Sequence, residues 1–415
     1  MREMKDSGIS WVGEIPKEWS VWRNKYIFKI TKDIVLPSKN YQLLSLTTTG
    51  IKEKDENDNG GKVPENYDGY QVVKENDLVM CLFDLDCSAV FSGLSPYNGM
   101  ISPAYKVLKV KKRIANEQYY RYWFNYVGSK RFYKQYSKSL RFTLNVDEFN
   151  RLFSLLPSLV EQQRIAEFLD RECGKIDGLK ADIQAQIDTL EQYKRSVITE
   201  AVTHGLNPSA PMKDSGIPWV GQFPTHWTKK KGKYILRYMS KPVKQDDGVI
   251  TCFRDGEVTL RSNRREDGFT MADKEIGYQG VDVGDLVVHG MDGFAGAIGI
   301  SDSRGKASPV LNVLNTKQNK KYIMYYLRSM AYGEVFTALS TGIRVRSCDL
   351  RWNKLAELLY PLPPIDEQNN IVNYIDEQIA RTNEIIADKK SQIETLDGYK
   401  KSLIYEYVTG KKEVG

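Results

Sequence analysis

The sequence has 415 residues, with 60 Lys and Arg against 53 Asp and Glu and a formal net charge of +7. This length corresponds to about two to four domains, and a hydrophobic content of 41% excludes a mostly disordered chain. No apolar run reaches the roughly 18 residues of a membrane-spanning helix, and no apolar segment follows the first residues as in a secretory signal. We therefore expect a soluble, cytoplasmic protein.

The first segment of the chain recurs near its middle. Lys5–Gly13 returns as Lys213–Gly221, 208 residues later, with a single difference, Ser10 against Pro218. Two unrelated domains that share a short motif would not show the further matches that follow in register, so the pattern indicates a tandem duplication. These matches pair Trp19 with Trp227, Asp77–Val79 with Asp285–Val287, Leu156–Pro157 with Leu362–Pro363, and Glu161–Gln162 with Glu367–Gln368.

The body of each copy is predicted to be mixed α/β. Short β-rich runs are separated by Gly, Asn and Pro turns, and a helical stretch follows the last of them in each copy. The expected strands are Tyr41–Thr48, Asp77–Phe83, Tyr105–Val110, Asp285–His289 and Val310–Leu314, and the expected helices lie near Asn116–Tyr126 and Lys320–Tyr332.

Each copy ends in a predicted long helix. Apolar positions recur at the 3.5-residue spacing of a coiled-coil seam, and the second helix repeats the register of the first after 206 residues. Ser158–Glu161 fits a capping box at the start of the first helix, and Gly205 is placed to end it. Forty residues give a rod of about 60 Å. The predicted helix-pairing residues are Ile165, Leu169, Ile176, Ile183, Ile187, Leu190, Ile371, Ile375, Ile379, Ile393, Leu396 and Leu403.

The predicted seam also includes Cys173, Leu179, Tyr193, Val197, Ile385 and Tyr399. Thr382 and Lys389 are its weakest members. Two such helices in one chain can cover each other's apolar stripe in an antiparallel coiled coil. The alternative is two separate helices, each packed on its own domain.

The predicted fold is an α/β (mixed α+β) tandem duplication with two globular domains and two long helices. The expected boundaries are 1–156 and 207–362 for the domains, and 157–206 and 363–415 for the helices. The net charges of the segments in chain order are +6, −3, +7 and −3. Because Lys and Arg neutralise phosphates, the two basic domains are the candidates for binding nucleic acid.

Candidate DNA-binding residues lie in charged clusters of the two domains. Between Lys106 and Arg141 there are 11 basic residues and one acid, interleaved with aromatic residues that could stack on bases. The aromatic residues of Tyr119–Tyr126 fit a domain core at least as well. Arg and Asn of the second domain could read guanine and adenine edges, although a solvated loop is the alternative. The candidates are Lys130, Arg131, Lys134, Lys138, Arg141, Arg254, Arg261, Asn263, Arg264, Arg265, Arg344 and Arg346.

Motifs of catalysis and metal binding are missing from the sequence. Five cysteines occur without CxxC spacing, only three histidines are present, and no GxxxxGK[ST], HExxH, GxSxG or [DNS]PP[YFW] motif is found. Asp84 and Asp86 flank Leu85 but fit a turn with solvated acids. We predict no catalytic residue and no metal site on this chain.

The repeated frame resembles that of DNA-specificity subunits of Type I restriction–modification systems. The resemblance rests on Lys5–Trp19 and Lys213–Trp227, on Leu156–Gln162 and Leu362–Gln368, and on the helix ends Tyr193–Ile198 and Tyr399–Ile404. It covers essentially the whole chain, because the motifs occur in the same order twice. Pro364–Asp366 in place of Ser158–Val160, and Lys389 in the seam, depart from the pattern.

The resemblance implies two target-recognition domains, each reading half of a split double-stranded DNA site. The two helices would pack antiparallel, set the separation of the half-sites and dock two modification (methyltransferase) subunits. S-adenosylmethionine, ATP and Mg²⁺ would belong to the modification and restriction (endonuclease and translocase) subunits, and this chain would hold no cofactor. Because the interiors of the two domains differ, we predict an asymmetric site.

Two other classes of protein remain open at this point. A non-catalytic interaction scaffold could carry basic domains on a coiled coil without reading DNA, and sequence-selective DNA binding would distinguish the two. A stand-alone nuclease or methyltransferase would require catalytic motifs that the sequence lacks.

Overall fold

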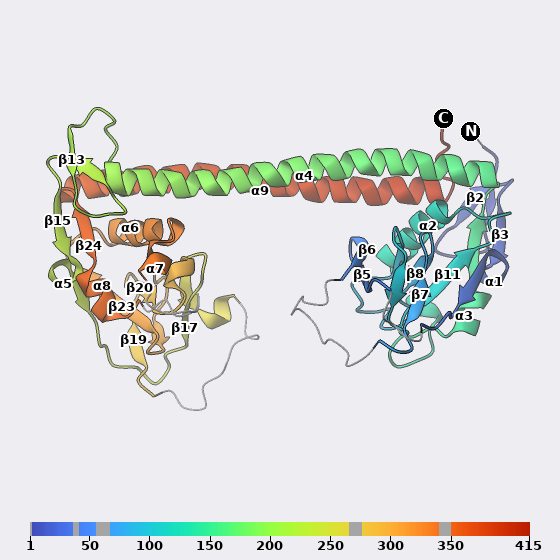
Figure 1. Cartoon of the computed structure of the whole chain (residues 1–415), viewed down its shortest axis with the longest axis horizontal. Coiled ribbons are helices and arrows are strands. Elements are labelled where there is room, and N and C mark those ends of the chain that lie inside the picture. Colours follow the sequence, from blue (N-terminus) through green and yellow to red (C-terminus); the bar gives the residue numbers. More distant parts are fainter. Residues whose placement is uncertain (1, 36–40, 55–66, 265–275, 340–349) are drawn as a thin grey trace. The chain divides into compact units, whose positions relative to one another are not determined.

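A computed structural model of the chain describes residues 2–35, 41–54, 67–264, 276–339 and 350–415. The chain forms two compact units. The first comprises Met1–Ile183 and Ser391–Gly415, and the second comprises Gln184–Lys390. Each unit contains one α/β domain and a segment of each of two long helices, α4 (Leu159–His204) and α9 (Ile365–Val408) (Figure 1).

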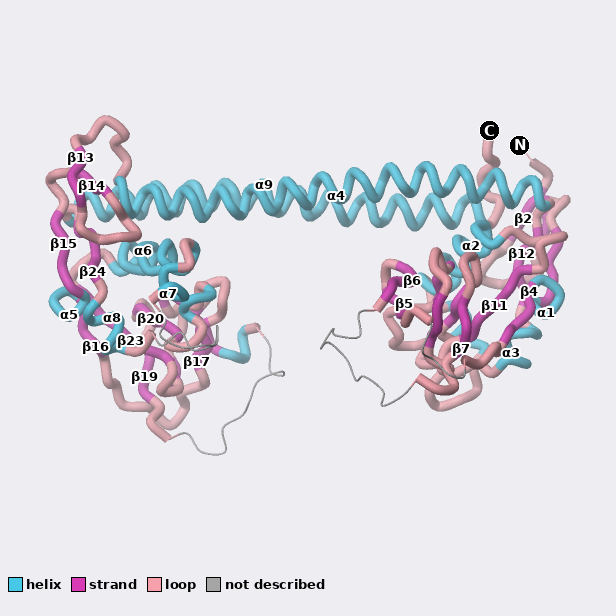
Figure 2. The backbone as a smooth tube through the Cα atoms, in the orientation of Figure 1, coloured by secondary structure: helices cyan, strands magenta, loops and turns pink. Residues whose placement is uncertain are grey.

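The domain of the first unit is built around an antiparallel sheet in the order β4-β11-β8-β9, and strand β9 is an edge strand. Short two-stranded pairs, β1-β2, β3-β12, β5-β6 and β7-β10, surround the sheet (Figure 2). Its elements are β1 (Met4–Asp6), β2 (Glu14–Pro16), β3 (Ser20–Arg23), α1 (Asn24–Ile27), β4 (Phe28–Thr31), β5 (Leu44–Thr47), β6 (Gly50–Glu53), β7 (Gln71–Val73), β8 (Leu78–Met80), β9 (Ser92–Leu94), β10 (Gly99–Ile101), β11 (Lys106–Val110), α2 (Glu117–Ser129), η1 (Phe132–Tyr136), α3 (Val146–Arg151) and β12 (Phe153–Leu156).

The second unit repeats this plan, with a four-stranded sheet in the order β16-β23-β20-β21. Helix α6 takes the place of α2 and follows the longest strand of the sheet. The elements are β13 (Met212–Asp214), β14 (Gln222–Pro224), β15 (Thr228–Lys231), α5 (Gly232–Ile235), β16 (Leu236–Tyr238), β17 (Ile250–Cys252), β18 (Val258–Leu260), η2 (Arg261–Asn263), β19 (Gln279–Val281), β20 (Leu286–His289), η3 (Gly293–Ala295), β21 (Ile298–Ile300), β22 (Gly305–Ala307), β23 (Leu311–Thr316), α6 (Lys320–Tyr332), α7 (Val335–Ala338), α8 (Trp352–Glu357) and β24 (Leu359–Leu362).

The repeated Lys-Asp-Ser-Gly motif forms the same turn in both units. In the first, the Asp6 carboxylate accepts a hydrogen bond from the Gly8 amide at 3.0 Å, and Gly8 has φ +71°. In the second, Asp214 accepts from the Gly216 amide at 2.8 Å, and Gly216 has φ +62°. Glycine populates this left-handed region without the steric cost of a Cβ atom. The duplicated motif therefore encodes this turn, and the turn is present in both units.

Helices α2 and α6 supply the largest part of each core. In α2, Tyr119, Tyr120, Trp123 and Phe124 are fully buried. The phenol of Tyr119 donates to the Val408 carbonyl of α9 at 3.0 Å, and the indole of Trp123 donates to Ser154 Oγ at 3.0 Å. The alternative that these aromatic residues form core rather than a stacking surface is thus confirmed.

The segments of α4 and α9 run antiparallel within each unit. In the first unit, Lys400 Nζ lies 2.7 Å from the Asp177 carboxylate, and Lys180 pairs with Asp397. In the second, Lys194 donates to Asn383 Oδ1 at 2.9 Å. Residue numbers on one helix rise as those of the partners on the other fall, which defines an antiparallel pair. The fold class predicted from the sequence is confirmed.

The predicted seam is wrong at four positions. Leu179, Tyr193, Ile385 and Tyr399 are 46–58% exposed, and the residue after each faces the other helix instead. Those residues are Lys180, Lys194, Ile386 and Lys400. A lysine can bury its aliphatic stem against the partner helix while its ammonium group reaches an acid or amide there. A hydrophobicity pattern does not detect such a seam position.

The predicted capping box at Ser158–Glu161 is half correct. The Glu161 amide donates to Ser158 Oγ at 3.2 Å, but the Glu161 carboxylate bonds to the domain instead of the helix start. Gly205, with φ +80°, follows the last residue of α4 as predicted.

Candidate nucleic-acid interface

Each domain is anchored to its helix segments by the same side chains. The indole of Trp19, 1% exposed, donates to Glu161 Oε2 of α4 at 2.9 Å. Trp227, fully buried, donates to Glu367 Oε1 of α9 at 3.0 Å. A hydrogen bond to an ionised acceptor is about twice as strong as a neutral one. The motifs shared by the two copies therefore hold the scaffold rather than contact a ligand.

The residue after each anchoring carboxylate makes the same bonds in both units. Gln162 accepts from the Asn116 amide at 2.8 Å and donates to the Pro157 carbonyl at 2.9 Å. Gln368 accepts from the Asn319 amide at 3.0 Å and donates to the Pro363 carbonyl at 2.9 Å. Asn116 and Asn319 are the N-caps of α2 and α6. Helices α2 and α6 are thus each positioned directly by the long helix beside them.

An exposed basic loop follows α2 in the first unit. We call Lys130–Arg141 the first basic loop, since its cationic side chains all face solvent: Lys130, Arg131, Lys134, Lys138 and Arg141. Tyr133 is buried beneath it and packs against Phe91 and Phe149. The contacts of the buried Tyr133 ring therefore fix the position of the loop that carries these exposed cations. The structure therefore brings together all five candidates that the sequence placed in this domain.

The second unit gathers three arginines around a cavity of about 570 Å³. Arg254, Arg261 and Arg264 line it, from the turn after β17 and from η2. We call this set the second basic cluster. Asn263 lies in the same segment and donates to Thr259 Oγ1 at 2.8 Å. The remaining candidates, Arg265, Arg344 and Arg346, lie outside the described residues.

Acidic side chains orient two arginines of the second basic cluster. Arg254 Nη2 lies 3.0 Å from Asp292, and Arg264 Nη1 lies 2.8 Å from Asp255 and 3.2 Å from Glu257. The Arg264 guanidinium also lies 4.1 Å from the centroid of the Phe253 ring. Exposed ion pairs of this kind contribute about 0–1 kcal/mol each. They are weak enough for a phosphate or base edge to replace the carboxylate, while holding the guanidinium groups in place.

Sequence reasoning missed His289 in this cavity. It lies at the end of β20, and its Nδ1 accepts from the amides of Met291 and Asp292, at 3.2 and 2.9 Å. Burial lowers the pKa of His289 below its ordinary value. The sequence signal that could have identified His289 was its place at the end of the predicted strand Asp285–His289.

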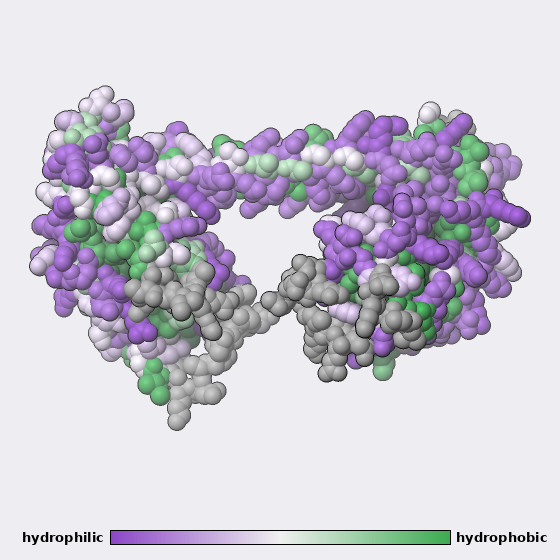
Figure 3. All heavy atoms as spheres, viewed as in Figure 1, coloured by the Kyte–Doolittle hydropathy of each residue, from purple (hydrophilic) through white to green (hydrophobic). Residues whose placement is uncertain are grey.

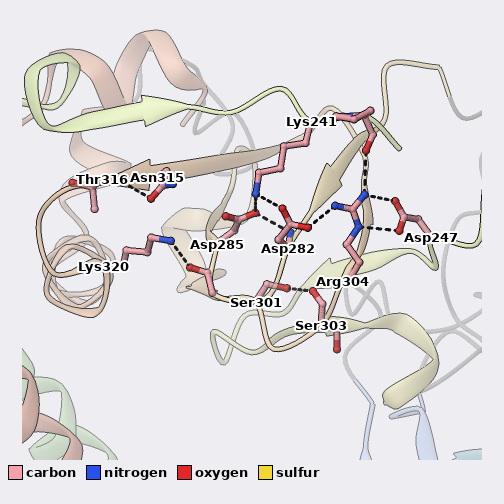
Figure 4. Close-up of polar contacts among 12 residues, drawn as sticks. Lys241, Asp247, Asp282, Asp285, Ser301, Ser303, Arg304, Asn315, Thr316 and Lys320 are labelled. Atoms are coloured by element: carbon pink, nitrogen blue, oxygen red, sulfur yellow. Dashed lines mark hydrogen bonds and ion pairs between the residues drawn. The ribbon is translucent and has the colours of Figure 1, made fainter. Parts of the chain in front are cut away.

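An ion network braces the sheet of the second unit (Figure 4). Arg304 makes two bonds to Asp247, at 3.0 and 2.8 Å, and contacts Asp282 as well. Lys241 bonds Asp282 at 2.7 Å and also contacts Asp285. Lys241 and Arg304 together lower the pKa of Asp282 to about 2. Every charge here has a partner, so the network serves the fold.

The predicted helix-pairing residues of α4 and α9 are all at least half-buried. Seven are buried and five are half-buried. The buried ones are Ile165, Leu169, Ile176, Ile187, Ile371, Ile375 and Leu403, and the half-buried ones are Ile183, Leu190, Ile379, Ile393 and Leu396.

Among the described residues, no three His, Cys, Asp or Glu side chains are grouped so that they could bind a metal ion. No helix in this part of the chain is long and apolar enough to cross a membrane.

The fold and these surfaces define a class: a duplicated α/β protein whose two domains carry basic clusters and attach to paired long helices. No family model matches the chain. Over 97% of its length it is 22% identical to 96% of a protein from Methanocaldococcus jannaschii provisionally assigned as the MjaX specificity subunit of a type I restriction enzyme. The resemblance drawn from the repeated motifs is thereby confirmed.

A solved structure with a TM-score above 0.5 shows the same fold. A chain from a study of complex assembly and conformational transition of a type I restriction–modification system matches with a TM-score of 0.66 and 13% identity, covering 96% of this chain and 99% of that one. The HsdS subunit of Thermoanaerobacter tengcongensis matches with a TM-score of 0.48 and 13% identity, covering 96% and 98%.

Proposed function

We propose that this chain is the DNA-specificity subunit of a Type I restriction–modification system and acts in the cytoplasm. One observation carries the proposal: the two units share their anchoring contacts and differ in their basic surfaces. Trp19 and Trp227 make equivalent bonds to α4 and α9, whereas the first basic loop and the second basic cluster come from different parts of their domains. Such a chain reads two different half-sites with one scaffold.

In this mechanism the chain binds and orients DNA and carries out no chemical step. The exposed cations neutralise phosphates of the two half-sites. Arginines of the second basic cluster, already oriented by Asp292 and Asp255, are placed to contact base edges. S-adenosylmethionine, ATP and Mg²⁺ would be held by the modification and restriction subunits, which supply methyl transfer and cleavage.

Exposed apolar residues on the long helices support docking of two modification subunits. In the first unit Leu179 and Tyr399 are 53% and 58% exposed, and the ion pairs Lys180–Asp397 and Asp177–Lys400 place them at the same level of the helix pair. Tyr193 and Ile385 hold the equivalent positions in the second unit, at 47% and 46%. Green spheres among purple ones mark exposed hydrophobic side chains along the helices (Figure 3). Two equal patches favour two copies of one partner.

Methylome sequencing of cells that express this chain with its modification subunit tests the proposal. We expect adenine methylation at a bipartite, asymmetric site. Arg264→Ala should relax one half-site and leave the other unchanged, whereas Arg237→Ala, which removes an exposed arginine of β16 outside the cluster, should change neither. Equal weakening on every sequence would make Arg264 a phosphate contact. Absence of sequence-selective methylation would favour the alternative, a non-catalytic interaction scaffold.

A further inference from the structure

Leu140, in the first basic loop, is the most exposed large apolar side chain in the described part of the chain. It is 101% exposed, and the next, Ile276, is 77% exposed. A half-exposed leucine is ordinary on a protein surface. Leu140 is different, because no neighbouring atom of the chain covers any part of it. The fold gains no burial from this side chain, so folding does not explain why an apolar residue stands at this position.

A tight turn holds Leu140 in place. The Phe142 amide donates to the Ser139 carbonyl at 3.0 Å, which makes Leu140 a central residue of a β-turn. The Thr143 amide donates to Ser139 Oγ at 2.7 Å, and the Ser137 hydroxyl donates to the Thr143 carbonyl at 2.9 Å. The apolar side chain therefore stands at the apex of an ordered turn whose two arms are bonded to each other.

The base of this turn is bonded to the body of the first domain. The Leu85 amide donates to the Phe142 carbonyl at 3.2 Å, and the Leu144 amide donates to the Leu82 carbonyl at 2.8 Å. Leu82, Leu85 and Leu144 are buried. A segment that is ordered before binding loses less conformational entropy when it binds. The apex of the turn is thus prepared to make a contact with a ligand.

Cations flank the exposed leucine in the chain. Lys138 and Arg141 are both exposed, and neither forms an ion pair with a carboxylate among the residues that the structure describes. By contrast, Arg254 and Arg264 of the second basic cluster are paired with acids. Cations without a partner are available to neutralise phosphates. The tip of the first basic loop therefore combines phosphate-binding groups with an apolar apex.

The two-armed form of the tip fits the major groove of DNA. Its arms lie side by side, because the hydroxyls of Ser137 and Ser139 both bond to the Thr143 carbonyl across the turn. The major groove of B-DNA is about 12 Å wide and admits an element of two strands, whereas the minor groove is only about 6 Å wide. The apolar group that base edges present in the major groove is the C5-methyl group of thymine.

We propose that Leu140 contacts the C5-methyl group of a thymine in the half-site that the first unit reads. The inference rests on the proposed function and adds a determinant of specificity to it. Lys138 and Arg141 bind the phosphates beside the groove, which every sequence offers. The methyl group belongs to thymine alone among the four bases, so the contact of Leu140 distinguishes one base pair from the others.

Uracil substitution tests the proposal, because it removes this methyl group and keeps the hydrogen bonds of the base pair. The full chain, assembled with modification subunits, is titrated with duplexes that carry the site found by methylome sequencing. Each thymine of one half-site is replaced in turn, and this half-site is the one that Arg264→Ala leaves unchanged. We expect about fourfold weaker binding at one position, the loss of one methyl contact. Equal binding of all the uracil duplexes would overturn the inference.

Leu140→Ala completes the cycle between side chain and methyl group. The variant should bind the thymine duplex about fourfold more weakly and should no longer respond to uracil, with an unchanged circular dichroism spectrum. Leu206→Ala is the matched control, since Leu206 is 41% exposed and lies just after α4, and it should keep the full response. A response to uracil that persists in Leu140→Ala would assign the methyl contact to another residue and refute the proposal.

Two further outcomes separate this inference from the proposed function. If Leu140→Ala weakens the complex while the wild type tolerates uracil at every position, Leu140 contacts a protein partner or a base step, and the thymine contact is wrong while the proposed function stands. A wild-type complex without sequence selectivity would refute the proposed function, and the inference with it.

Discussion

Replacing Glu161 by alanine should loosen the first domain from its helices. The carboxylate accepts from the Trp19 indole at 2.9 Å and pairs with Arg2. Trp19 is 1% exposed, so its N–H would remain buried without a partner. The cost of such an orphan is about 1–3 kcal/mol, and the acceptor is charged. We expect a loss of about 2 kcal/mol from the free energy of unfolding of the first unit.

The assay is thermal unfolding of the full chain followed by calorimetry, which separates the transitions of the two units. At about 2–4 °C per kcal/mol for units of about 200 residues, the transition of the first unit should fall by roughly 4–8 °C. Glu167→Ala is the matched control, because Glu167 is exposed on the same helix and accepts only from Gln163. Glu367→Ala should lower the other transition, through Trp227.

A double-mutant cycle with Trp19→Phe distinguishes the hydrogen bond from general loss of contact. The cost of Glu161→Ala should shrink by about 1 kcal/mol or more once the indole N–H is gone. Equal costs for Glu161→Ala and Glu167→Ala, or additive effects in the cycle, would refute the reasoning.

Three further outcomes follow from the geometry. Because the folded-state pKa of Asp282 is about 2, below its ordinary value, its ion pairs stabilise the second unit above about pH 4 and lose this effect as the pH falls toward 2. Asp282→Asn should cost about 1 kcal/mol at pH 6, discounted because the side chain is 48% exposed, and almost nothing at pH 2. Gly299→Ala should cost about 1–3 kcal/mol in denaturant titrations, since its Cβ would meet the Gly256 carbonyl at 2.0 Å. Gly178→Ala in α4, with nothing within 4 Å of the added Cβ, should instead stabilise the first unit by about 0.5–1 kcal/mol.

Each of these outcomes has a contrary result that would correct the structure. A penalty for Asp282→Asn that persists at pH 2 would show that the ion network is not its source. Stable Gly299→Ala would place the 253–257 turn farther from β21, and a destabilising Gly178→Ala would place a neighbour against α4.

The framework of the protein was predictable because its motifs have local causes. Asp6 and Gly8 are sufficient to predict a turn. The spacing of Leu169 and Ile176 is sufficient to predict the buried face of a helix. Such signals depend on residues near one another in the chain, and duplication presents each of them twice.

The seam and the interface were harder to predict because partners distant in the chain decide them. Lys400 occupies an inner position of the helix pair only because Asp177 lies opposite. The Glu161 carboxylate does not cap α4, because it accepts a hydrogen bond from the Trp19 indole instead. Arg254, Arg261 and Arg264 were recognised as a charged set, but His289 joins them through the sheet. The hydrophobicity and charge pattern of one segment does not show which distant residues its side chains will contact.

The division of the chain between the two units has a consequence for its biosynthesis. The second unit is continuous, Gln184–Lys390, but the core of the first includes Leu403, Ile404 and Val408 of α9. At about 5–20 residues per second, a ribosome needs roughly 10–40 s to add the intervening residues. The first unit therefore cannot complete its core until α9 has been translated, because residues of α9 pack against the aromatic residues of α2. Maturation of this protein runs in the opposite order to its translation.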